Sequence, residues 1–578
     1  MNRNFRNTIV FFFFISLKLL GQNPLFIPDT LSGVNFSLSV QTGTKQFIGT
    51  YTTNTYGYNG NFLGPTLILQ KNDSVKINVT NNLNQSTTVH WHGLHVAPKN
   101  DGGPHQIIQP GSVWSPSFKV RNEASTFWYH PHGENKTELQ VTKGLAGMII
   151  IRDAQERTYT LPRRYKVDDF PIIVQSKAFD VLYQLATATH EDSVVMVNGT
   201  IDPFLSVPQQ IVRFRMLNGS SDRTYNFGLS NNSTFSLIAS DGGLLSQPLS
   251  QNRLRLSPGE RAEILINLST YSVGTQLYLK SYASELTRGI IGADTVGTAN
   301  LLISEGYYGN KLNGKNFNIL RMDVVAATPS PVLTVPVSFT PKIPLLESNS
   351  NANRLIVFTP DTITSGQQGK VDGPFLMNKK PFHMDTINIV TLLNNTEVWT
   401  LQNKTMVAHP FHIHDIQFYV LDINGLPPPA EYQGLKDVIL VRPNETVRFI
   451  TQFTTFRDNQ VPYMYHCHLL HHEDDGMMGS FLVLFPNEIG IKESHTNKND
   501  LILFPNPAND LLRVKCPSED NYSNKNIKIY NSVGQLVLQT HITDNEFELN
   551  TKELPAGCYY FNLSSSKIAI NKLLLIKR

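Results

Sequence analysis

Residues 465–478 read YHCHLLHHEDDGMM, and they carry the densest group of metal-ligand side chains in the chain. Cys467 stands between His466 and His468, and two further histidines and two methionines follow within eleven residues of it. Successive side chains of a β-strand point to opposite faces. An extended conformation would therefore direct Cys467 to one face and both flanking imidazoles to the other. Cysteine, histidine and a weak methionine form the ligand set of blue copper, so this stretch predicts two metal centres joined through the backbone.

Three further stretches place histidines two residues apart: HWHG at 90–93, HPHG at 130–133 and HPFHIH at 409–414. Residues i and i+2 lie on one strand face about 6.6 Å apart, which suits two neighbouring metal ions better than one. An isolated pair of this kind is more often a surface feature than a metal site. Here four such motifs together supply ten candidate ligands among the 17 histidines of the chain. An incidental surface feature is therefore a weak explanation for them. A blue centre of His409, Cys467, His472 and Met477 would leave eight histidines, enough for three more ions.

The blocks HWHGLHV, WYHPHG, HPFHIHDIQF and HCHLLHHEDDGMM resemble the four copper motifs of the multicopper oxidases, the family of laccases, bilirubin oxidases and bacterial cuprous oxidases. The resemblance extends over about residues 23–486 and implies four copper ions. By this resemblance the type 1 site consists of His409, Cys467, His472 and Met477, and the type 2 copper is bound by His90 and His412. One type 3 copper would be held by His92, His130 and His468, and the other by His132, His414 and His466. Met478 is interpreted as core packing, because methionine is a common core filler.

Short segments that alternate apolar and polar residues, such as 74–79, 211–217 and 262–266, predict half-buried antiparallel strands. Pattern and resemblance together predict an all-β chain of three cupredoxin-like Greek-key sandwiches and a small C-terminal β-sandwich. In the middle sandwich, Pro258-Gly259-Glu260-Arg261 resembles the copper-free domain of the family. The expected divisions are a signal peptide (1–21), a first sandwich (22–155), a second without copper ligands (165–305), a connector (306–353), a third sandwich (354–487), a linker (488–500) and a C-terminal module (501–578).

Both ends of the chain resemble export signals. Residues 1–21 contain Arg3 and Arg6 followed by an apolar run, which is typical of a secretory signal peptide. Residues 501–578 resemble the type A sorting domain of the type IX secretion system, through FPNP at 504–507, IYNSVGQ at 529–535 and LPAGCY at 554–559. The resemblance implies contact with that secretion machinery, then cell-surface attachment or release. A simple carbohydrate-binding or adhesion sandwich remains the alternative for this module.

Composition excludes several kinds of partner. The chain has 49 basic and 46 acidic residues, a net charge of +3, and no clustered basic run, so neither nucleic-acid binding nor strong membrane-surface binding is expected. We also expect no transmembrane anchor and a monomer. Only three cysteines occur, and Cys467 is assigned to copper. Cys516 and Cys558 both lie in the C-terminal module. The two alternatives there are a disulfide between them and a Cys558 thiol buried as a small hydrophobic side chain.

Two carboxylates are candidate proton carriers. Asp101, eleven residues after His90, and Glu473, directly after His472, match acidic positions that the family uses near its copper cluster. We therefore predict catalytic roles for Asp101, Glu473 and the electron-carrying Cys467. The alternatives are that Asp101 caps the turn it begins and that Glu473 is solvated.

The resemblance implies one-electron oxidation of a substrate at the type 1 copper, coupled to four-electron reduction of O2 to water. Residues 305–381 contain only Met322 and Met377, whereas cuprous-oxidase specialists have a methionine-rich segment there. We therefore predict a laccase-like oxidase of phenols or aromatic amines. The alternatives are a cuprous ion oxidase and a non-catalytic cupredoxin protein of the cell envelope. A two-domain nitrite reductase lacks the paired cluster ligands, and a copper carrier would have Met- and His-rich flexible tracts, which are missing.

Overall fold

The structure of the protein is a computed structural model that describes residues 22–187, 189–297, 306–361, 373–488, 501–516, 525–531, 534–564 and 569–578. The expected signal peptide, and nearly all of the expected linker after residue 488, lie outside these ranges. The chain forms two compact units, one ending at Val483 and one beginning at Leu484. In the described ranges no helix has the length and apolar content needed to cross a membrane.

The first domain is a sandwich of two five-stranded sheets. Its elements are β2 (Thr30–Ser32), β3 (Asn35–Lys45), β4 (Thr53–Tyr58), β5 (Thr66–Gln70), β6 (Ser74–Asn81), β7 (His90–His92), β8 (Val113–Trp114), β9 (Ser117–Lys119), β10 (Ser125–His130), α1 (Thr137–Thr142) and β11 (Gly147–Arg152). One sheet has the order β2-β5-β11-β10-β7, and the other has the order β4-β3-β6-β8 with β9 beside β6. Alternate residues of β3, Phe36, Leu38 and Val40, enter the core between the sheets. This alternation is the reason the segment folds as a half-buried strand.

The middle domain pairs a six-stranded sheet with an eight-stranded one. Its strands are β1 (Asn23–Pro24), β12 (Asp169–Phe179), β13 (Leu185–Ala186), β14 (Val194–Val197), β15 (Thr200–Ile201), β16 (Pro203–Pro208), β17 (Ile211–Asn218), β18 (Tyr225–Leu229), β19 (Phe235–Ser240), β20 (Gly243–Gln251), β21 (Leu254–Leu256), β22 (Arg261–Asn267), β23 (Gln276–Tyr282) and β24 (Asn316–Val325). The sheets have the orders β1-β16-β24-β23-β18-β21 and β15-β14-β12-β17-β22-β19-β20, with β13 beside β12. Two segments that we assigned elsewhere belong to the first of these sheets. β1 pairs with β16, and β24, from the expected connector, lies between β16 and β23 because its alternate residues are apolar.

The third domain is again a pair of five-stranded sheets. Its elements are β25 (Ala352–Pro360), β26 (Phe375–Met377), β27 (Ile389–Leu392), β28 (Thr396–Asn403), β29 (His409–Ile413), β30 (Tyr419–Ile423), β31 (Val438–Val441), β32 (Thr446–Gln452), β33 (Asp458–Cys467), α2 (Leu470–Asp474) and β34 (Met478–Leu484). The orders are β26-β25-β28-β32-β30 and β27-β34-β33-β29-β31. The core between them includes Cys467 and Met477.

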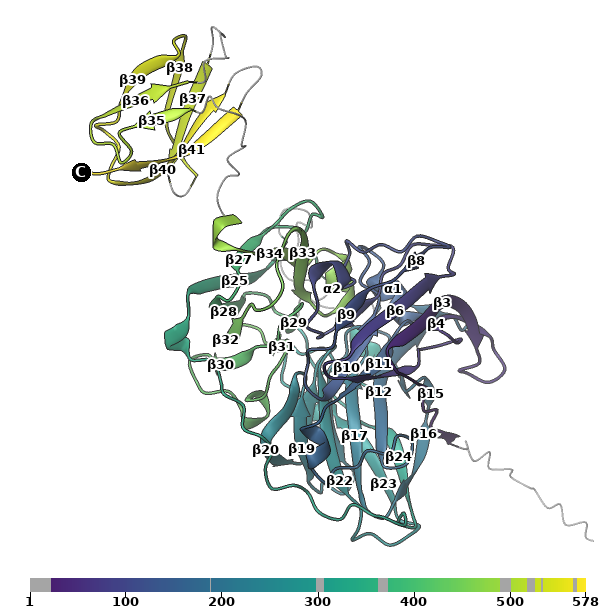
Figure 1. The fold of residues 1–578 in the computed structure, drawn as a ribbon. Coiled ribbons are helices and arrows are strands. Elements are labelled where there is room, and N and C mark those ends of the chain that lie inside the picture. The colour runs from purple at the N-terminus through teal and green to yellow at the C-terminus, as the bar shows by residue number, and fades with distance from the viewer. Residues whose placement is uncertain are drawn as a thin grey trace, which may run out of the picture. The chain divides into compact units, whose positions relative to one another are not determined.

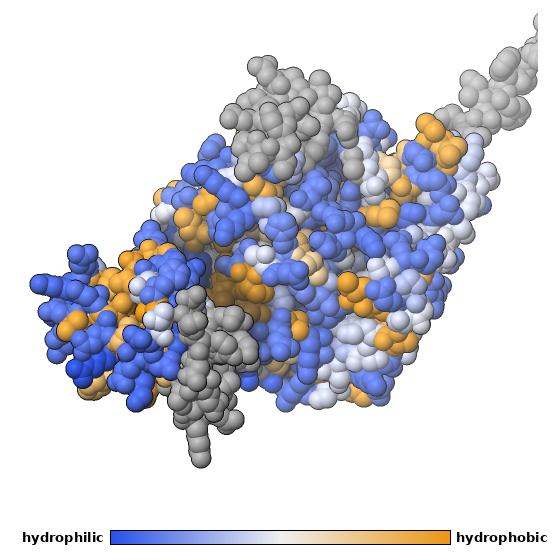
Figure 2. All heavy atoms as spheres, turned by 90° about the horizontal axis from the view of Figure 1, so that it is seen from above, coloured by the Kyte–Doolittle hydropathy of each residue, from blue (hydrophilic) through white to orange (hydrophobic). Residues whose placement is uncertain are grey.

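Within the first unit, Figure 1 shows the purple and blue strands of the first domain, the teal strands of the middle domain and the green strands of the third. Three sandwiches with separate cores and only two short α-helices among the described residues confirm the predicted all-β fold. Hydrophilic and hydrophobic residues are mixed over the face seen in Figure 2, while the large apolar side chains fill the sandwich interiors.

The C-terminal unit is a small sandwich with a core of its own. Its strands are β35 (Ile502–Phe504), β36 (Leu511–Lys515), β37 (Lys525–Asn531), β38 (Leu536–Ile542), β39 (Glu546–Asn550), β40 (Gly557–Ser564) and β41 (Ala569–Ile576). The sheets have the orders β35-β36-β39 and β38-β37-β40-β41. No disulfide joins the two cysteines of the module, Cys516 and Cys558, both of which lie in its described part, the first buried and the second exposed.

Candidate metal centre

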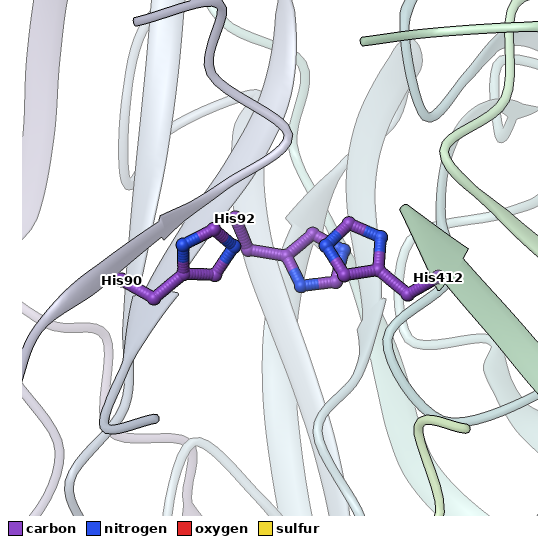
Figure 3. Close-up of side chains that lie close together, drawn as sticks. All are labelled: His90, His92 and His412. Carbon is purple, nitrogen blue, oxygen red and sulfur yellow. The ribbon is translucent and has the colours of Figure 1, made fainter. Parts of the chain in front are cut away.

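Strand pairing brings the histidine motifs together from two domains. In the first domain, β7 pairs with β10 and sets His90 opposite His130. In the third domain, β29 pairs with β33 and sets His412 opposite His466. Figure 3 shows His90 and His92 from one domain and His412 from the other pointing toward one another. The cluster therefore forms only where the first and third domains meet.

The candidate ligands fall into four buried groups, and within each group one ligand atom per residue lies within 4.8 Å of the others. The groups are His90, His92 and His412; His92, His130 and His468; His132, His414 and His466; and His409, Cys467 and His472. Every predicted histidine and cysteine ligand is thus beside the partners that the sequence assigned to it. His92 lies close enough to contribute to two groups.

In His90 and His412, a hydrogen bond on one ring nitrogen leaves the other nitrogen facing the cluster. His90 Nδ1 donates to the carbonyl oxygen of Asp101 at 2.9 Å, and His412 Nδ1 donates to the carbonyl oxygen of Asp437 at 2.8 Å. A neutral imidazole has a single N–H, so Nε2 of each ring keeps an unshared lone pair. Within the described part of the chain, both Nε2 atoms are buried without a hydrogen-bond partner. This is the arrangement of a histidine prepared to bind a metal ion.

A second set of lone pairs meets at His466. The Nε2 atoms of His132 and His414 lie 3.2 and 3.4 Å from Nε2 of His466. On their opposite sides, His414 Nδ1 lies 2.7 Å from a carboxylate oxygen of Asp101. The Nδ1 atoms of His132 and His466 lie 3.2 and 3.1 Å from the two oxygens of Glu473. Three lone pairs this close repel one another unless a cation lies between them.

Cys467 faces away from that cluster and toward a separate site. Its Sγ lies 3.5 Å from His409 Nδ1 and 3.6 Å from His472 Nδ1. The other nitrogen of His409 lies 2.7 Å from the Thr405 hydroxyl oxygen, which leaves Nδ1 for the site. Met477 is fully buried in the same core, and its carbonyl oxygen accepts the Cys467 N–H at 3.0 Å. Opposite faces of one short stretch therefore serve two sites.

Burial sets the protonation of these groups. It lowers the pKa of His409 to about 3 and, followed by the charge of His132, holds the pKa of His90 well below its ordinary value. Neutral imidazoles are what a metal ion requires. Burial also raises the pKa of the Cys467 thiol well above its ordinary value, so only a bound cation would hold the thiolate there. A soft sulfur ligand with two imidazoles, and with a methionine buried in the same core, fits copper.

The two predicted carboxylates both lie at the cluster. Asp101 is 1% exposed and contacts His414 through its side chain and His90 through its backbone. Burial, and then the charge of Asp415, raise the pKa of Asp101 well above its ordinary value. Glu473 is fully buried, which excludes the alternative that it is solvated. Burial alone would raise the pKa of Glu473, but the neighbouring His132 and the histidine at 466 hold it below its ordinary value.

Two buried residues that we did not single out as site residues contact the candidate ligands, and a third, Arg261, contacts one of these two. Thr405 bonds to His409, and Asp437 bonds to two cluster histidines and to Arg261 of the middle domain. Arg261 belongs to a motif that the sequence did show, whereas Asp437 and Thr405 carry no local signal of their own. Met478 lies in a small hydrophobic cluster that includes Met464.

Comparison with known proteins agrees with this geometry. Family models described as multicopper oxidase match residues 39–156, 174–300 and 355–485. The multicopper oxidase mco of Staphylococcus haemolyticus is 34% identical over 480 residues, which cover 80% of this chain and 93% of the relative. The chain belongs to the multicopper oxidase family. It is accordingly a copper-binding oxidoreductase, as its motifs predict.

Other members show how far the likeness extends. The laccase-like multi-copper oxidase CueO from Ochrobactrum sp. superposes with a TM-score of 0.69 at 32% identity, covering 80% of this chain and all of that one. The cell division protein FtsP of Dickeya dadantii is 29% identical and covers 81% of this chain and 94% of the relative. A secretion system C-terminal sorting domain matches residues 502–577, which confirms the predicted module and indicates export.

Proposed function

We propose that this multicopper oxidase is a laccase-like enzyme that oxidises phenols or aromatic amines one electron at a time and reduces O2 to water. Four phenols would give four phenoxyl radicals, four protons and four electrons, and O2 would take up those electrons and protons to give two water molecules. The observation that carries the proposal is a buried Cys467 whose two neighbouring histidines belong to a separate group of eight.

The ligand groups support binding of four copper ions. Copper at these positions would supply one-electron redox chemistry and the reduction of O2. We assign the type 1 ion to His409, Cys467, His472 and Met477, and the type 2 ion to His90 and His412. We assign the two type 3 ions to His92, His130 and His468, and to His132, His414 and His466.

The chain itself would connect the two sites and supply protons. Cys467 is covalently joined to His466 and His468, so only one residue of backbone separates the sulfur site from the cluster. We propose that Asp101 and Glu473 hold protons for oxygen reduction, since the carboxylate of Asp101 lies 2.7 Å from His414 Nδ1. Burial of both carboxylates beside the cluster supports this role.

The choice of a phenolic substrate over cuprous ion is supported by the position of the sulfur atoms. Met322 and Met377, the only methionines in residues 305–381, are both buried in domain cores and would not capture a soft metal ion at the surface. The solved relative from Ochrobactrum sp. is described as active toward lignin model compounds and lignosulfonate, which are aromatic. The similar FtsP of Dickeya dadantii is described as a cell division protein and not as an oxidase, so catalysis by this chain has to be tested directly.

The test combines metal analysis with oxygen uptake. We expect four coppers per copper-loaded chain and faster oxygen uptake with a methoxyphenol than with cuprous ion. Cys467→Ser should lose the blue colour and turnover, whereas Cys516→Ser, a change in the C-terminal module, should retain both. A chain that stays metal-free and inert after copper loading would refute the oxidase. A preference for cuprous ion would refute only the substrate.

We further propose that the mature protein is a monomer that reaches the cell surface or the medium. The sorting module supports passage through a secretion system. We expect cell fractionation to find the full chain outside the cell and a chain without the C-terminal module inside it. Light scattering would measure its mass, and a dimer mass would refute the monomer.

A further inference from the structure

The Pro258–Arg261 loop of the middle domain reaches the predicted copper cluster, although the described residues of that domain supply no candidate ligand. The loop leads directly into β22, and both Glu260 and Arg261 are fully buried. A loop that only closed a turn within its own domain would not need two buried charges, because burying charge is costly unless it is paired.

Arg261 pairs with Asp437 of the third domain. Its two terminal nitrogens, Nη1 and Nη2, donate to the two carboxylate oxygens of Asp437 at 2.5 and 2.7 Å. Neither side chain is exposed to solvent. Two parallel hydrogen bonds of this kind fix the plane of the carboxylate as well as its position.

Asp437 in turn contacts two cluster histidines from different domains. Its carboxylate oxygen Oδ1 lies 3.2 Å from His92 Nε2, and its carbonyl oxygen accepts a hydrogen bond from His412 Nδ1 at 2.8 Å. These contacts fix which nitrogen of each ring carries the proton and leave the other nitrogen for a metal ion. The two rings stack with centroids 3.8 Å apart. One aspartate therefore orients a ligand from each side of the domain boundary.

Gly259 contacts a third candidate ligand. Its φ of +84° lies in the left-handed region, and a Cβ there would lie 2.8 Å from the ring carbon Cδ2 of His468. A side chain at this position would therefore strain the backbone and push the imidazole. The same short loop thus limits His468 by close contact and orients His92 and His412 through Asp437.

Further buried charged residues hold the loop and Asp437 in place. Lys436, next to Asp437, donates to Glu260 at 2.8 Å and lies 2.9 Å from a carboxylate oxygen of Asp241. Asp241 also accepts the backbone N–H of Arg261 at 2.7 Å. The loop and the residue it orients are therefore held by partners in both domains.

We propose that Arg261, Gly259 and Asp437 are positioning residues through which the middle domain sets the orientation of three cluster histidines. The inference rests on the proposed copper cluster and adds a role for the domain that has no ligand. A purely structural role at the domain boundary would affect folding stability without altering the bound copper.

The experiment measures copper affinity by chelator competition and records the electron paramagnetic resonance spectrum of the type 2 copper. In the full chain, Asp437→Asn and Gly259→Ala should each weaken cluster copper binding by about 10- to 100-fold. Both should also alter the type 2 spectrum and leave the blue absorption of the Cys467 site unchanged. Arg261→Lys, which keeps the charge but loses the planar fork, should produce the same change more weakly.

Matched controls separate positioning from general stability. Asp169→Asn removes a buried carboxylate that pairs with Arg215 through two hydrogen bonds away from the ligands. Gly289→Ala adds a methyl group at a φ of +91°, where it would meet Pro443 of the third domain. Both controls should keep the wild-type spectrum and copper affinity, whatever their melting temperatures.

Two results would overturn the inference while the oxidase proposal stands. One is wild-type copper affinity and spectra in Asp437→Asn, Gly259→Ala and Arg261→Lys. The other is an equal spectral change in the two controls. A wild-type chain that takes up no copper would instead overturn the proposed function itself.

Discussion

At the scale of single residues, Asp101 shows how one residue can serve two ligands, one through its backbone and one through its side chain. Its carbonyl oxygen accepts a hydrogen bond from His90 Nδ1, and its carboxylate lies 2.7 Å from His414 Nδ1. The first contact needs only the backbone, so a substitution of the side chain would leave it in place. The second contact depends on the carboxylate, and so does any proton that the residue carries.

Replacing Asp101 by asparagine therefore tests the proton role separately from ligand position. Asp101→Asn should slow oxygen reduction by about 100-fold or more, the usual size of a lost acid–base contribution. Reduction of the Cys467 site by a phenol under nitrogen should stay unchanged. Stopped-flow reduction followed by reoxidation measures both steps. The control is Asp153→Asn, a change at a buried carboxylate that accepts the backbone N–H groups of Ala124 and Glu156. Unaltered reoxidation in Asp101→Asn would exclude the role.

The residues that could be predicted from sequence are those whose signal is local. His90 and His92, or His466 and Cys467, are recognisable because their spacing along one strand determines their faces. Asp437 was not recognisable, since its partner Arg261 is 176 residues away and only the packing of two domains brings them together. Long-range contacts of this kind depend on how the domains pack against one another, and the pattern of apolar and polar residues along the sequence does not predict that packing.

At the scale of elements, a short helix of the third domain caps a short helix of the first. The side chain of Asp474, at the end of α2, accepts the backbone N–H groups of Thr137 and Glu138 at 3.0 and 2.9 Å. The residue before α1, Lys136, provides no side-chain cap of its own. The first turn of a helix has unsatisfied N–H groups, so Asp474 replaces a local cap from a distance.

Removing this cap should lower stability measurably. Asp474→Ala should reduce the free energy of unfolding by about 1 kcal/mol, within the range measured for lost helix caps. Urea unfolding of the copper-free chain, followed by circular dichroism, measures the change. Asp385→Ala, at an exposed position, should shift the value by less than about 0.5 kcal/mol. Equal stability of Asp474→Ala and wild type would show that water replaces the cap without cost.

Elements also show where sequence patterns mislead. Residues 328–353 are rich in proline and serine, which made the whole of 306–353 look like a connector. The alternating apolar residues of Asn316–Val325 nevertheless form β24 in the interior of a six-stranded sheet. The segment forms a strand because it pairs with β16 on one side and β23 on the other. Composition alone does not identify these partners.

At the scale of the whole molecule, a buried ionic network joins the first two domains. Arg213 of the middle domain contacts Glu156 from the end of the first domain and Glu263 of its own sheet. Arg215 contacts Glu263 and also the Thr126 hydroxyl of the first domain. Buried charges are stable only while each has its partner, so the network makes the two sandwiches depend on one another.

The network predicts a specific dependence of stability on pH. Burial alone would raise the pKa of Glu156, but Arg213 and Arg152 hold it at about 2, compared with 4.5 for an unfolded chain. Since the folded pKa is the lower one, ionised Glu156 stabilises the fold above pH 4.5, and this gain is lost as the pH falls toward 2. Glu156→Gln should therefore be less stable than wild type by about 3 kcal/mol at pH 7. The difference, measured by urea unfolding of the copper-free proteins, should shrink steadily below pH 4.5, whereas Glu134→Gln, at an exposed site, should match wild type at every pH. A difference that stays constant down to pH 2 would mean that the pKa of Glu156 is the same in the folded and the unfolded protein, and that packing rather than charge joins the two domains at this point.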